Sequence, residues 1–170
     1  MKYLIIALLA CSSFSPAAFA DAPMVRIAVG EARTKKSVIA FPTLVASGDA
    51  EGRLRSIREI TMEDLGFSGL FDFLNPAAFV EDSSKAGVTT GSFKMTDWSA
   101  IGAEFLLKGK GTVDRTGLNL EIYLYAVQSG KQLLAKRYKA SPDTIRKVAH
   151  TLSNDILFAL TGKKGPFTSK

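Results

Sequence analysis

The chain has 170 residues, a formal net charge of +6, one histidine and one cysteine. A single histidine excludes metal sites built on several imidazoles, and a single cysteine excludes an internal disulfide. The basic residues are spread along the sequence and do not form a dense stripe interleaved with aromatic residues, so we expect no nucleic-acid partner. The length suits one compact domain.

The N-terminus has the pattern of a secretory leader. A basic start, Met1-Lys2, precedes an apolar stretch over residues 3–10 that is too short to span a bilayer, and the small-residue site Ala18-Phe19-Ala20 follows. We therefore predict a signal peptide over residues 1–20, cleaved between Ala20 and Asp21.

A second interpretation of this leader stays open. Leu8-Leu9-Ala10-Cys11 resembles a lipoprotein box, in which Cys11 would be lipidated and would become the new N-terminus. We expect contact with a membrane only if Cys11 is lipidated in this way. Cleavage after Ala20 would instead remove the cysteine altogether.

The mature chain should begin with strands. Residues 24–30 alternate apolar and other side chains with period two, as a half-buried strand does. Residues 31–36 are charged and should form a loop. Residues 37–41 read as a buried strand that ends at Pro42, because proline cannot donate a hydrogen bond to a sheet.

A helix is predicted to follow Gly48 and Asp49 and to end at Gly66. Its apolar face is expected to contain Leu54, Ile57, Thr61 and Leu65. The phenylalanines of residues 67–73 should pack under the sheet.

The next segment is less regular. Residues 81–92 are polar and contain two glycines, so we expect the most mobile internal loop there. Thr96 or Asp97 can cap a short helix over residues 98–102, in which Trp98 should be a core anchor.

The C-terminal part predicts an antiparallel meander and a closing helix. Residues 104–113, 118–127 and 131–140 are of strand length and are separated by hairpin-type turns. A helix over 142–160, with Ser141 as its N-cap, should cover the sheet. We therefore predict an α+β two-layer sandwich: a mixed sheet with a C-terminal antiparallel meander, covered by two main helices.

The sequence carries no recognisable catalytic motif. It has no phosphate-binding loop, dinucleotide fingerprint, Cys-x-x-Cys pair or nucleophile elbow. His150 lies beside the apolar stripe of the closing helix, where a boundary-packed or hydrogen-bonded role is expected. We predict no catalytic, cofactor-binding or metal-ligating residue and no enzyme activity.

The chain is expected to end in a linker. Residues 162–170 are rich in glycine, proline and polar side chains, as domain boundaries are. We therefore expect an α+β domain over residues 21–161 and a linker over 162–170, in a module that belongs to something longer.

Four blocks along the mature chain resemble the N-terminal domain of the TolB family of the bacterial Tol-Pal envelope system. The two most specific blocks are Trp98-Ser99-Ala100-Ile101-Gly102-Ala103-Glu104 and the ending Leu160-Thr161-Gly162-Lys163-Lys164-Gly165-Pro166-Phe167. The others are Asp64-Leu65 with Ser68-Gly69-Leu70-Phe71, and Arg146-Lys147-Val148-Ala149-His150 with Asn154-Asp155-Ile156.

The resemblance implies a periplasmic interaction module that binds TolA and supports outer-membrane integrity and constriction during cell division. It also implies a fold like that of anticodon-binding domains. In the family a β-propeller follows this domain and is the main surface for Pal, so the present chain alone should bind Pal weakly or not at all. The segment matching the family's TolA-binding peptide comprises Asp21, Ala22, Pro23, Met24, Val25, Arg26, Ile27, Ala28, Val29, Gly30, Glu31, Ala32 and Arg33.

One alternative function remains open on the sequence. The chain could be a free-standing periplasmic or lipid-anchored α+β binding domain that shares this fold and has other partners.

Overall fold

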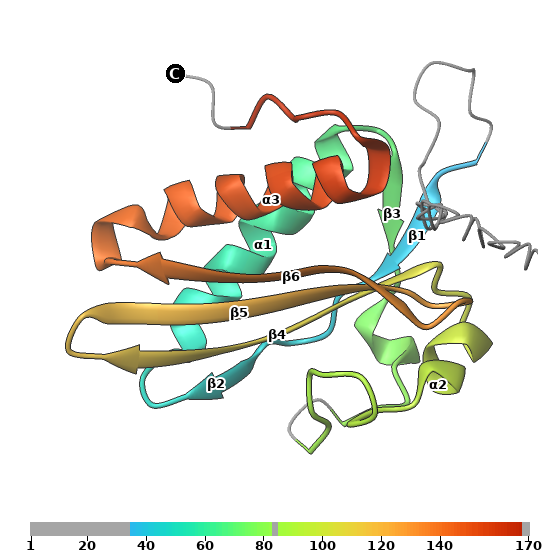
Figure 1. Cartoon of the computed structure of the whole chain (residues 1–170), viewed down its shortest axis with the longest axis horizontal. Coiled ribbons are helices and arrows are strands. Elements are labelled where there is room, and N and C mark those ends of the chain that lie inside the picture. The colour runs from blue at the N-terminus through green and yellow to red at the C-terminus, as the bar shows by residue number, and fades with distance from the viewer. Residues whose placement is uncertain (1–34, 83–84, 168–170) are drawn as a thin grey trace, which may run out of the picture.

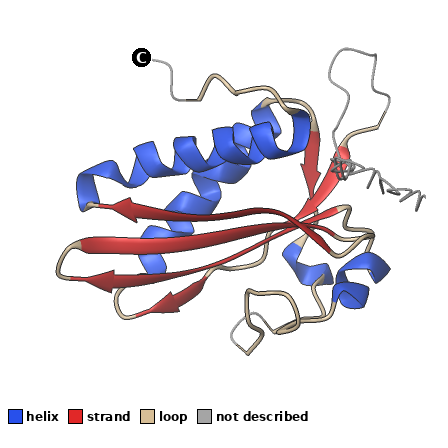
Figure 2. Ribbon diagram, viewed as in Figure 1, coloured by secondary structure: helices blue, strands red, loops and turns tan. Residues whose placement is uncertain are grey.

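The computed structural model describes residues 35–82 and 85–167. They form a six-stranded mixed sheet whose main path has the order β3-β1-β4-β5-β6, with β2 paired to β4 beside that path. Figures 1 and 2 show the long helices α1 and α3 together on one face of the sheet, and the short helix α2 on the other side at one end. The predicted α+β sandwich is confirmed.

The strands and helices are β1 Ser37–Ala40, β2 Val45–Ser47, α1 Glu51–Phe67, β3 Phe71–Phe73, a 3₁₀ turn Pro76–Ala78, α2 Met95–Ala100, β4 Phe105–Asp114, β5 Gly117–Ala126, β6 Lys131–Ala140, a 3₁₀ turn Pro142–Thr144 and α3 Ile145–Thr161.

Strands β4, β5 and β6 form the predicted antiparallel meander. In the β4–β5 hairpin Phe105 pairs with Ala126 and Asp114 pairs with Gly117. Gly117 has a φ of +125°, and a Cβ there would lie 2.5 Å from the carbonyl oxygen of Ala140, so a larger residue would not fit this turn. Between β5 and β6 the register shifts at Leu124/Tyr125.

Strand β5 directs its alternating aliphatic side chains to the helical layer. Because successive side chains of a strand point to opposite faces, the alternating leucines and isoleucine of β5 all face the same way. Each of them is buried, and the set is Leu118, Leu120, Ile122 and Leu124.

Both long helices bury the faces that their periodicity indicates. The buried side chains of α1 are Leu54, Ile57, Thr61 and Leu65, as predicted. Helix α3 follows its 3₁₀ turn, and the backbone N–H of Ser141 donates to Thr144 Oγ1 at 2.9 Å at its start. Its buried side chains are Ala149, Leu152, Ser153, Ile156, Leu157, Leu160 and Thr161.

Residues 66–73 differ from the prediction. Helix α1 continues to Phe67, and the left-handed residue that redirects the chain is Gly69, with a φ of +72°, instead of Gly66. Phe67 is 87% exposed. Phe71 is buried as the first residue of β3, which pairs in parallel with β1. Only part of this aromatic group therefore packs on the core.

Helix α2 begins earlier than predicted, at Met95, and Trp98 within it is buried as the expected anchor. Trp98 belongs to a second, smaller apolar cluster on the face of the sheet opposite the long helices.

The last described residues turn back onto α3. Gly162 ends the helix with a φ of +75°, and the backbone N–H of Phe167 donates to Asn154 Oδ1 at 3.4 Å. The Phe167 side chain packs against the main apolar core. The linker predicted over 162–170 thus has at least one residue in contact with the domain, while its boundaries remain a prediction.

Candidate protein-interaction site

The residues predicted to bind a partner, Asp21 to Arg33, lie outside the described part of the chain, as does the cleavage site Ala20-Asp21. The first described residue is Lys35, two residues before β1 begins at Ser37. The structure therefore locates the point at which the predicted segment joins the domain and leaves the segment itself untested.

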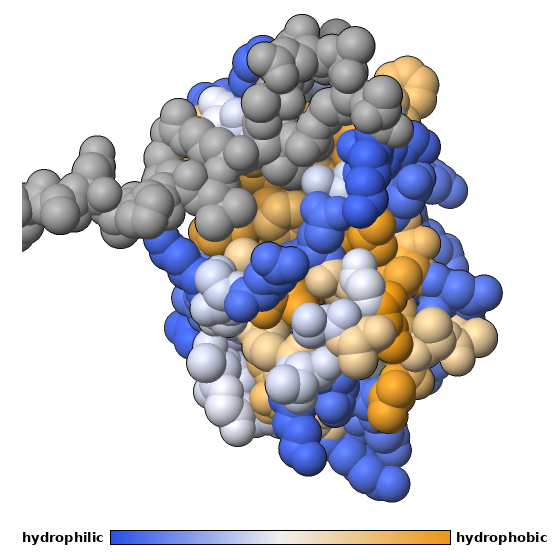
Figure 3. Space-filling model, turned by 90° about the vertical axis from the view of Figure 1, so that its right-hand side faces the viewer, coloured by the Kyte–Doolittle hydropathy of each residue, from blue (hydrophilic) through white to orange (hydrophobic). Residues whose placement is uncertain are grey.

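An open hollow of about 530 Å³ lies at this junction, and we call it the root hollow. The ammonium of Lys35 lies 3.9 Å from Glu104 Oε1, and the backbone N–H of Glu104 donates to Val38 O at 2.9 Å. Figure 3 faces this end of the molecule and shows apolar residues reaching the surface between hydrophilic ones. The root hollow is lined by Lys35, Ser99, Gly102, Ala103, Glu104, Phe105, Ala126, Gln128 and Ser129.

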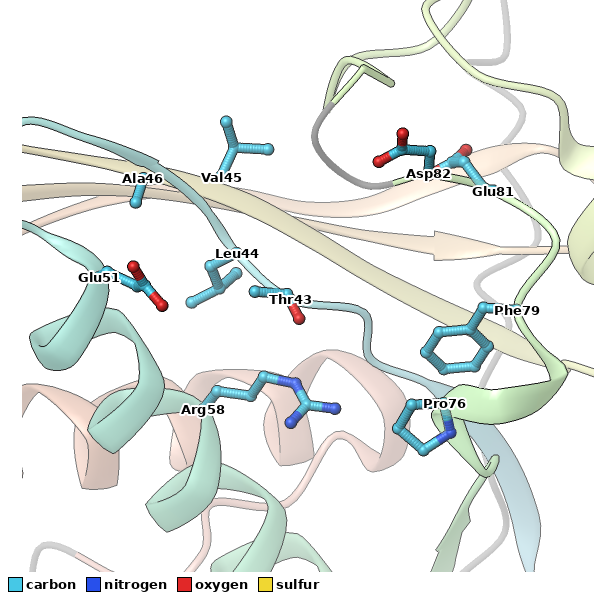
Figure 4. A pocket seen from close by; sticks show the side chains of 10 residues that line it. All are labelled: Thr43, Leu44, Val45, Ala46, Glu51, Arg58, Pro76, Phe79, Glu81 and Asp82. Carbon is cyan, nitrogen blue, oxygen red and sulfur yellow. The ribbon is translucent and has the colours of Figure 1, made fainter.

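A second cavity, of about 620 Å³, lies beside β2, and we call it the β2 cleft. Figure 4 shows Glu51 at one end and Asp82 at the other, with residues 43–46 between them. Segments distant in the sequence build its walls, which are Thr43, Leu44, Val45, Ala46, Glu51, Arg58, Pro76, Phe79, Glu81 and Asp82.

Arg58 of α1 holds the wall formed by the connection between β1 and β2. Its Nε and Nη2 donate to the carbonyl oxygen of Phe41 at 2.8 and 2.6 Å, and its guanidinium lies 5.5 Å from the centre of the Phe41 ring. Partial burial lowers the pKa of Arg58 from its ordinary value, and the charge of Glu59 opposes this shift. The hydrogen bonds satisfy a carbonyl at the point where Pro42 interrupts the strand.

A buried ion pair holds the opposite wall. Lys108 of β4 has a side chain only 3% exposed, and its ammonium is hydrogen-bonded to Glu81. The indole N–H of Trp98 donates to the same carboxylate at 3.4 Å, and Phe79 meets the Trp98 ring edge to face at 5.1 Å between centroids. The Lys108 ammonium also lies 4.4 Å from the centre of the Phe93 ring, where a cation is attracted to the aromatic face.

These contacts show that the loop expected to be most mobile is fixed at specific points. Glu81 is held by Lys108, and Val88 is buried with its carbonyl accepting a 2.8 Å hydrogen bond from Tyr125 Oη. The pairing of Glu81 with Lys108 was not predicted from the sequence. The only available signal was the position of Lys108 directly after the apolar residues Phe105, Leu106 and Leu107, which does not identify an acid 27 residues away.

The remaining open face of the sheet carries a charged row centred on Glu121. Its carboxylate lies 3.4 Å from Lys110 Nζ and 3.0 Å from Arg137 Nε. Partial burial raises the pKa of Glu121. Hydrogen bonds from Tyr123 and Lys110 and the charges of Lys110 and Arg137 together lower the pKa by more than burial raises it, so the net shift is downward.

The single histidine takes the boundary position that was predicted for it. His150 Nδ1 of α3 lies 2.8 Å from Asp64 Oδ2 of α1, so the contact joins the two helices. Among the described residues no group of three or more His, Cys, Asp or Glu side chains could hold a metal ion. Within the same residues, no helix combines the length and the apolar character needed to cross a membrane.

The fold, together with the root hollow and the β2 cleft, defines a small α+β domain with open, partly charged concave surfaces. The chain belongs to the family of the TolB amino-terminal domain, whose model matches residues 25–133. It is 37% identical over 129 residues to the Tol-Pal system protein TolB of Geobacter metallireducens, covering 76% of this chain and 29% of that protein. It is 31% identical over 170 residues to the corresponding protein of Desulfosudis oleivorans, covering 98% of this chain and 38% of that protein.

A solved structure supports the fold. The crystal structure of TolB from Acinetobacter baumannii superposes with a TM-score of 0.62 at 24% sequence identity, over 79% of this chain and 30% of that chain. The present chain therefore spans less than two fifths of the length of the curated relatives named above.

Proposed function

We propose that this chain is a periplasmic protein–protein interaction module of the Tol-Pal system and that it binds TolA through residues 21–33. Membership of the TolB family and the Tol-Pal names of its relatives support the system. The observation that carries the choice of segment is the family match, which begins at residue 25 and so includes most of the proposed peptide. In this role the chain acts by binding and catalyses no reaction, and it supports outer-membrane integrity and constriction during division.

The chemistry of the segment suits pairing with a partner's sheet. Val25, Ile27 and Val29 alternate with other residues, so an extended conformation puts them on one face and Arg26 on the other. An extended peptide that adds to a sheet edge gains affinity from main-chain hydrogen bonds and selectivity from alternate side chains. We propose that Pal is bound weakly or not at all by this chain alone.

The direct test is deletion of residues 21–33, with binding to the C-terminal domain of TolA measured by calorimetry. We expect binding to be lost while the thermal unfolding transition stays cooperative, because a terminal segment contributes little to global packing. A deletion variant that retains the wild-type affinity would overturn the proposal.

A matched pair of variants then tests the mode of binding. Ile27→Pro removes a backbone donor and fixes φ, whereas Ile27→Ala removes only side-chain atoms. We expect Ile27→Pro to weaken TolA binding more than Ile27→Ala. Equal losses would contradict strand pairing and would indicate that the side chain alone makes the contact.

Export can be tested separately. We expect the secreted product to begin at Asp21, and intact-mass measurement of the exported protein reports its first residue directly. A product that begins at Cys11 with added acyl mass would establish the lipoprotein alternative.

A further inference from the structure

The β2 cleft lies along a strand that has one neighbour. Val45–Ser47 pairs in parallel with Lys110, Gly111 and Thr112 of β4, and β2 has no second partner among the described strands. Alternate backbone groups of a strand point toward each of its sides, so a strand with one neighbour presents unpaired donors and acceptors on its other edge. In this protein that edge adjoins an open cavity of about 620 Å³.

Apolar surface is available next to this edge. Val45 and Phe79 are partly exposed, and Ala46 and Pro76 are exposed, while Leu44 is buried beneath them. Figure 4 shows Phe79 and Pro76 on the side of the cavity opposite Glu51. An extended peptide could therefore place alternate apolar side chains against these residues while its backbone runs along β2.

The charge of the β2 cleft differs from that of the whole chain. The protein carries a formal net charge of +6, yet the charged residues that line the cleft are Glu51, Glu81, Asp82 and one arginine. The side chains of Glu51 and Asp82 are 74% and 52% exposed at the rim, each in an ion pair with a lysine or arginine of its own segment. Arg58, the one cation, directs two of its nitrogens to the Phe41 carbonyl.

We propose that the β2 cleft is a docking site for an extended segment of a partner protein in which lysine or arginine alternates with apolar residues. The segment adds a strand beside β2, its apolar side chains contact Val45, Ala46 and Phe79, and its basic side chains meet the carboxylates of Glu51 and Asp82. An acidic segment would meet these same carboxylates and be repelled.

Contacts within the chain hold both walls of the β2 cleft in place. Arg58 holds the Phe41 carbonyl on one side, and the Lys108–Glu81 ion pair holds the residue next to Asp82 on the other. Ordering a flexible site lowers its affinity, so a preformed cleft binds a ligand with only a small entropic cost from its own residues.

This site shares no residue with the proposed TolA-binding segment. The segment joins the domain at Lys35, before β1, whereas the cleft begins at Thr43, after β1 has ended at Ala40. Loss of residues 21–33 should therefore leave binding in the β2 cleft unchanged, and failure of either proposal is distinguishable from failure of the other.

The test uses two synthetic probes, acetyl-(Lys-Val)₃-amide and acetyl-(Glu-Val)₃-amide, titrated into the ¹⁵N-labelled mature chain and followed by amide chemical shifts. We expect the basic probe to shift amides of residues 43–47, 51 and 79–82, and the acidic probe to leave them in place. The proposal would be overturned if the basic probe at saturation shifted the amides of a different surface, or if the two probes bound with equal affinity.

Charge-reversed variants provide the matched control. Glu51→Lys and Glu63→Lys make the same change on the same helix, but only Glu51 lines the cleft. We expect Glu51→Lys to weaken the basic probe about fivefold and Glu63→Lys to change it less than about twofold, because only the first replaces an exposed attraction in the cleft by a repulsion. Asp82 lies in a loop, and we expect Asp82→Lys to weaken binding of the basic probe to a similar degree. This variant shows whether the effect of Glu51→Lys comes from the charge of the cleft or from a change at the start of α1. Equal affinities in all three variants would refute the docking site.

Discussion

The two faces of the central sheet are covered in different ways, although β4 and β5 contribute side chains to both. On one face the long helices α1 and α3 pack against a broad, mainly aliphatic core. On the other face α2 and its flanking loops cover one end of the sheet through a smaller cluster of mixed aliphatic and aromatic side chains around Trp98 and Tyr125. A buried ion pair, Lys108 with Glu81, adjoins that second cluster.

The difference follows from the covering segments. A long amphipathic helix presents a continuous apolar stripe, so burial of area alone can hold it on a sheet. The irregular segment between β3 and β4 has no such stripe and is attached by individual contacts, including the Tyr125–Val88 hydrogen bond of 2.8 Å and the contact of Glu81 with Lys108. The helical face should therefore respond to a reduction in side-chain volume, and the opposite face to the removal of a charge partner.

The largest effect is expected where a charge is left without its partner. Glu81→Ala leaves the Lys108 ammonium on a central strand at 3% exposure with no anion, and should lower the free energy of unfolding by about 3–5 kcal/mol. Lys108→Met should be less damaging, because Glu81 belongs to a loop and can turn toward water. Urea denaturation of both variants measures the difference. A more destabilised Lys108→Met would show that Glu81 cannot turn toward water when its partner is removed.

On the helical face, Leu152→Ala should lower the free energy of unfolding by about 2–5 kcal/mol, since a fully buried leucine loses its transfer free energy and leaves a cavity. Phe158→Ala on the same helix is the control, because Phe158 is 52% exposed and its replacement should change stability by less than about 0.5 kcal/mol. Comparable destabilisation of the two variants in guanidinium melts would contradict the assignment of the buried face of α3.

A smaller effect is expected at the contact between the helices. His150→Ala removes the 2.8 Å contact with Asp64. The Asp64 carboxylate is partly exposed between α1 and α3 and can still contact water. We expect the free energy of unfolding to fall by about 1 kcal/mol, typical of one partly exposed hydrogen bond. Thermal unfolding beside Leu152→Ala provides the comparison, and a His150→Ala variant less stable than Leu152→Ala would mean that the helices are held together chiefly by this polar contact.

The smallest effect is expected on the uncovered part of the sheet and should depend on pH. The pKa of Glu121 is lowered in the folded protein, so its carboxylate contributes stability above the ordinary value of 4.5, and the contribution is lost as pH falls through the folded pKa. Glu121→Gln should cost less than about 1 kcal/mol at pH 7. Its stability should converge on that of the wild type as the pH falls below 4.5. A difference that persists unchanged in acid would exclude the ion pairs with Lys110 and Arg137 as its source.

Regular elements with their own periodicity were predictable from the sequence. The buried face of α1, the three strands of the meander and the sheet-covering role of α3 all follow from repeats of apolar residues within single segments. Trp98 as an anchor and His150 at a boundary were likewise predictable from their own segments. The TolA-binding assignment of residues 21–33 rests on the family resemblance and remains a prediction.

Other features depend on contacts between distant segments, and only the tertiary structure decided them. Strands β2 and β3 have three residues each, too few to show a period, and exist because they pair in parallel with β4 and β1. The β2 cleft is likewise assembled from the β1–β2 connection, α1 and the segment after β3. A sequence pattern reports which side chains of one element share a face, whereas the partner of a short strand or of a buried charge is fixed by the packing of the whole chain.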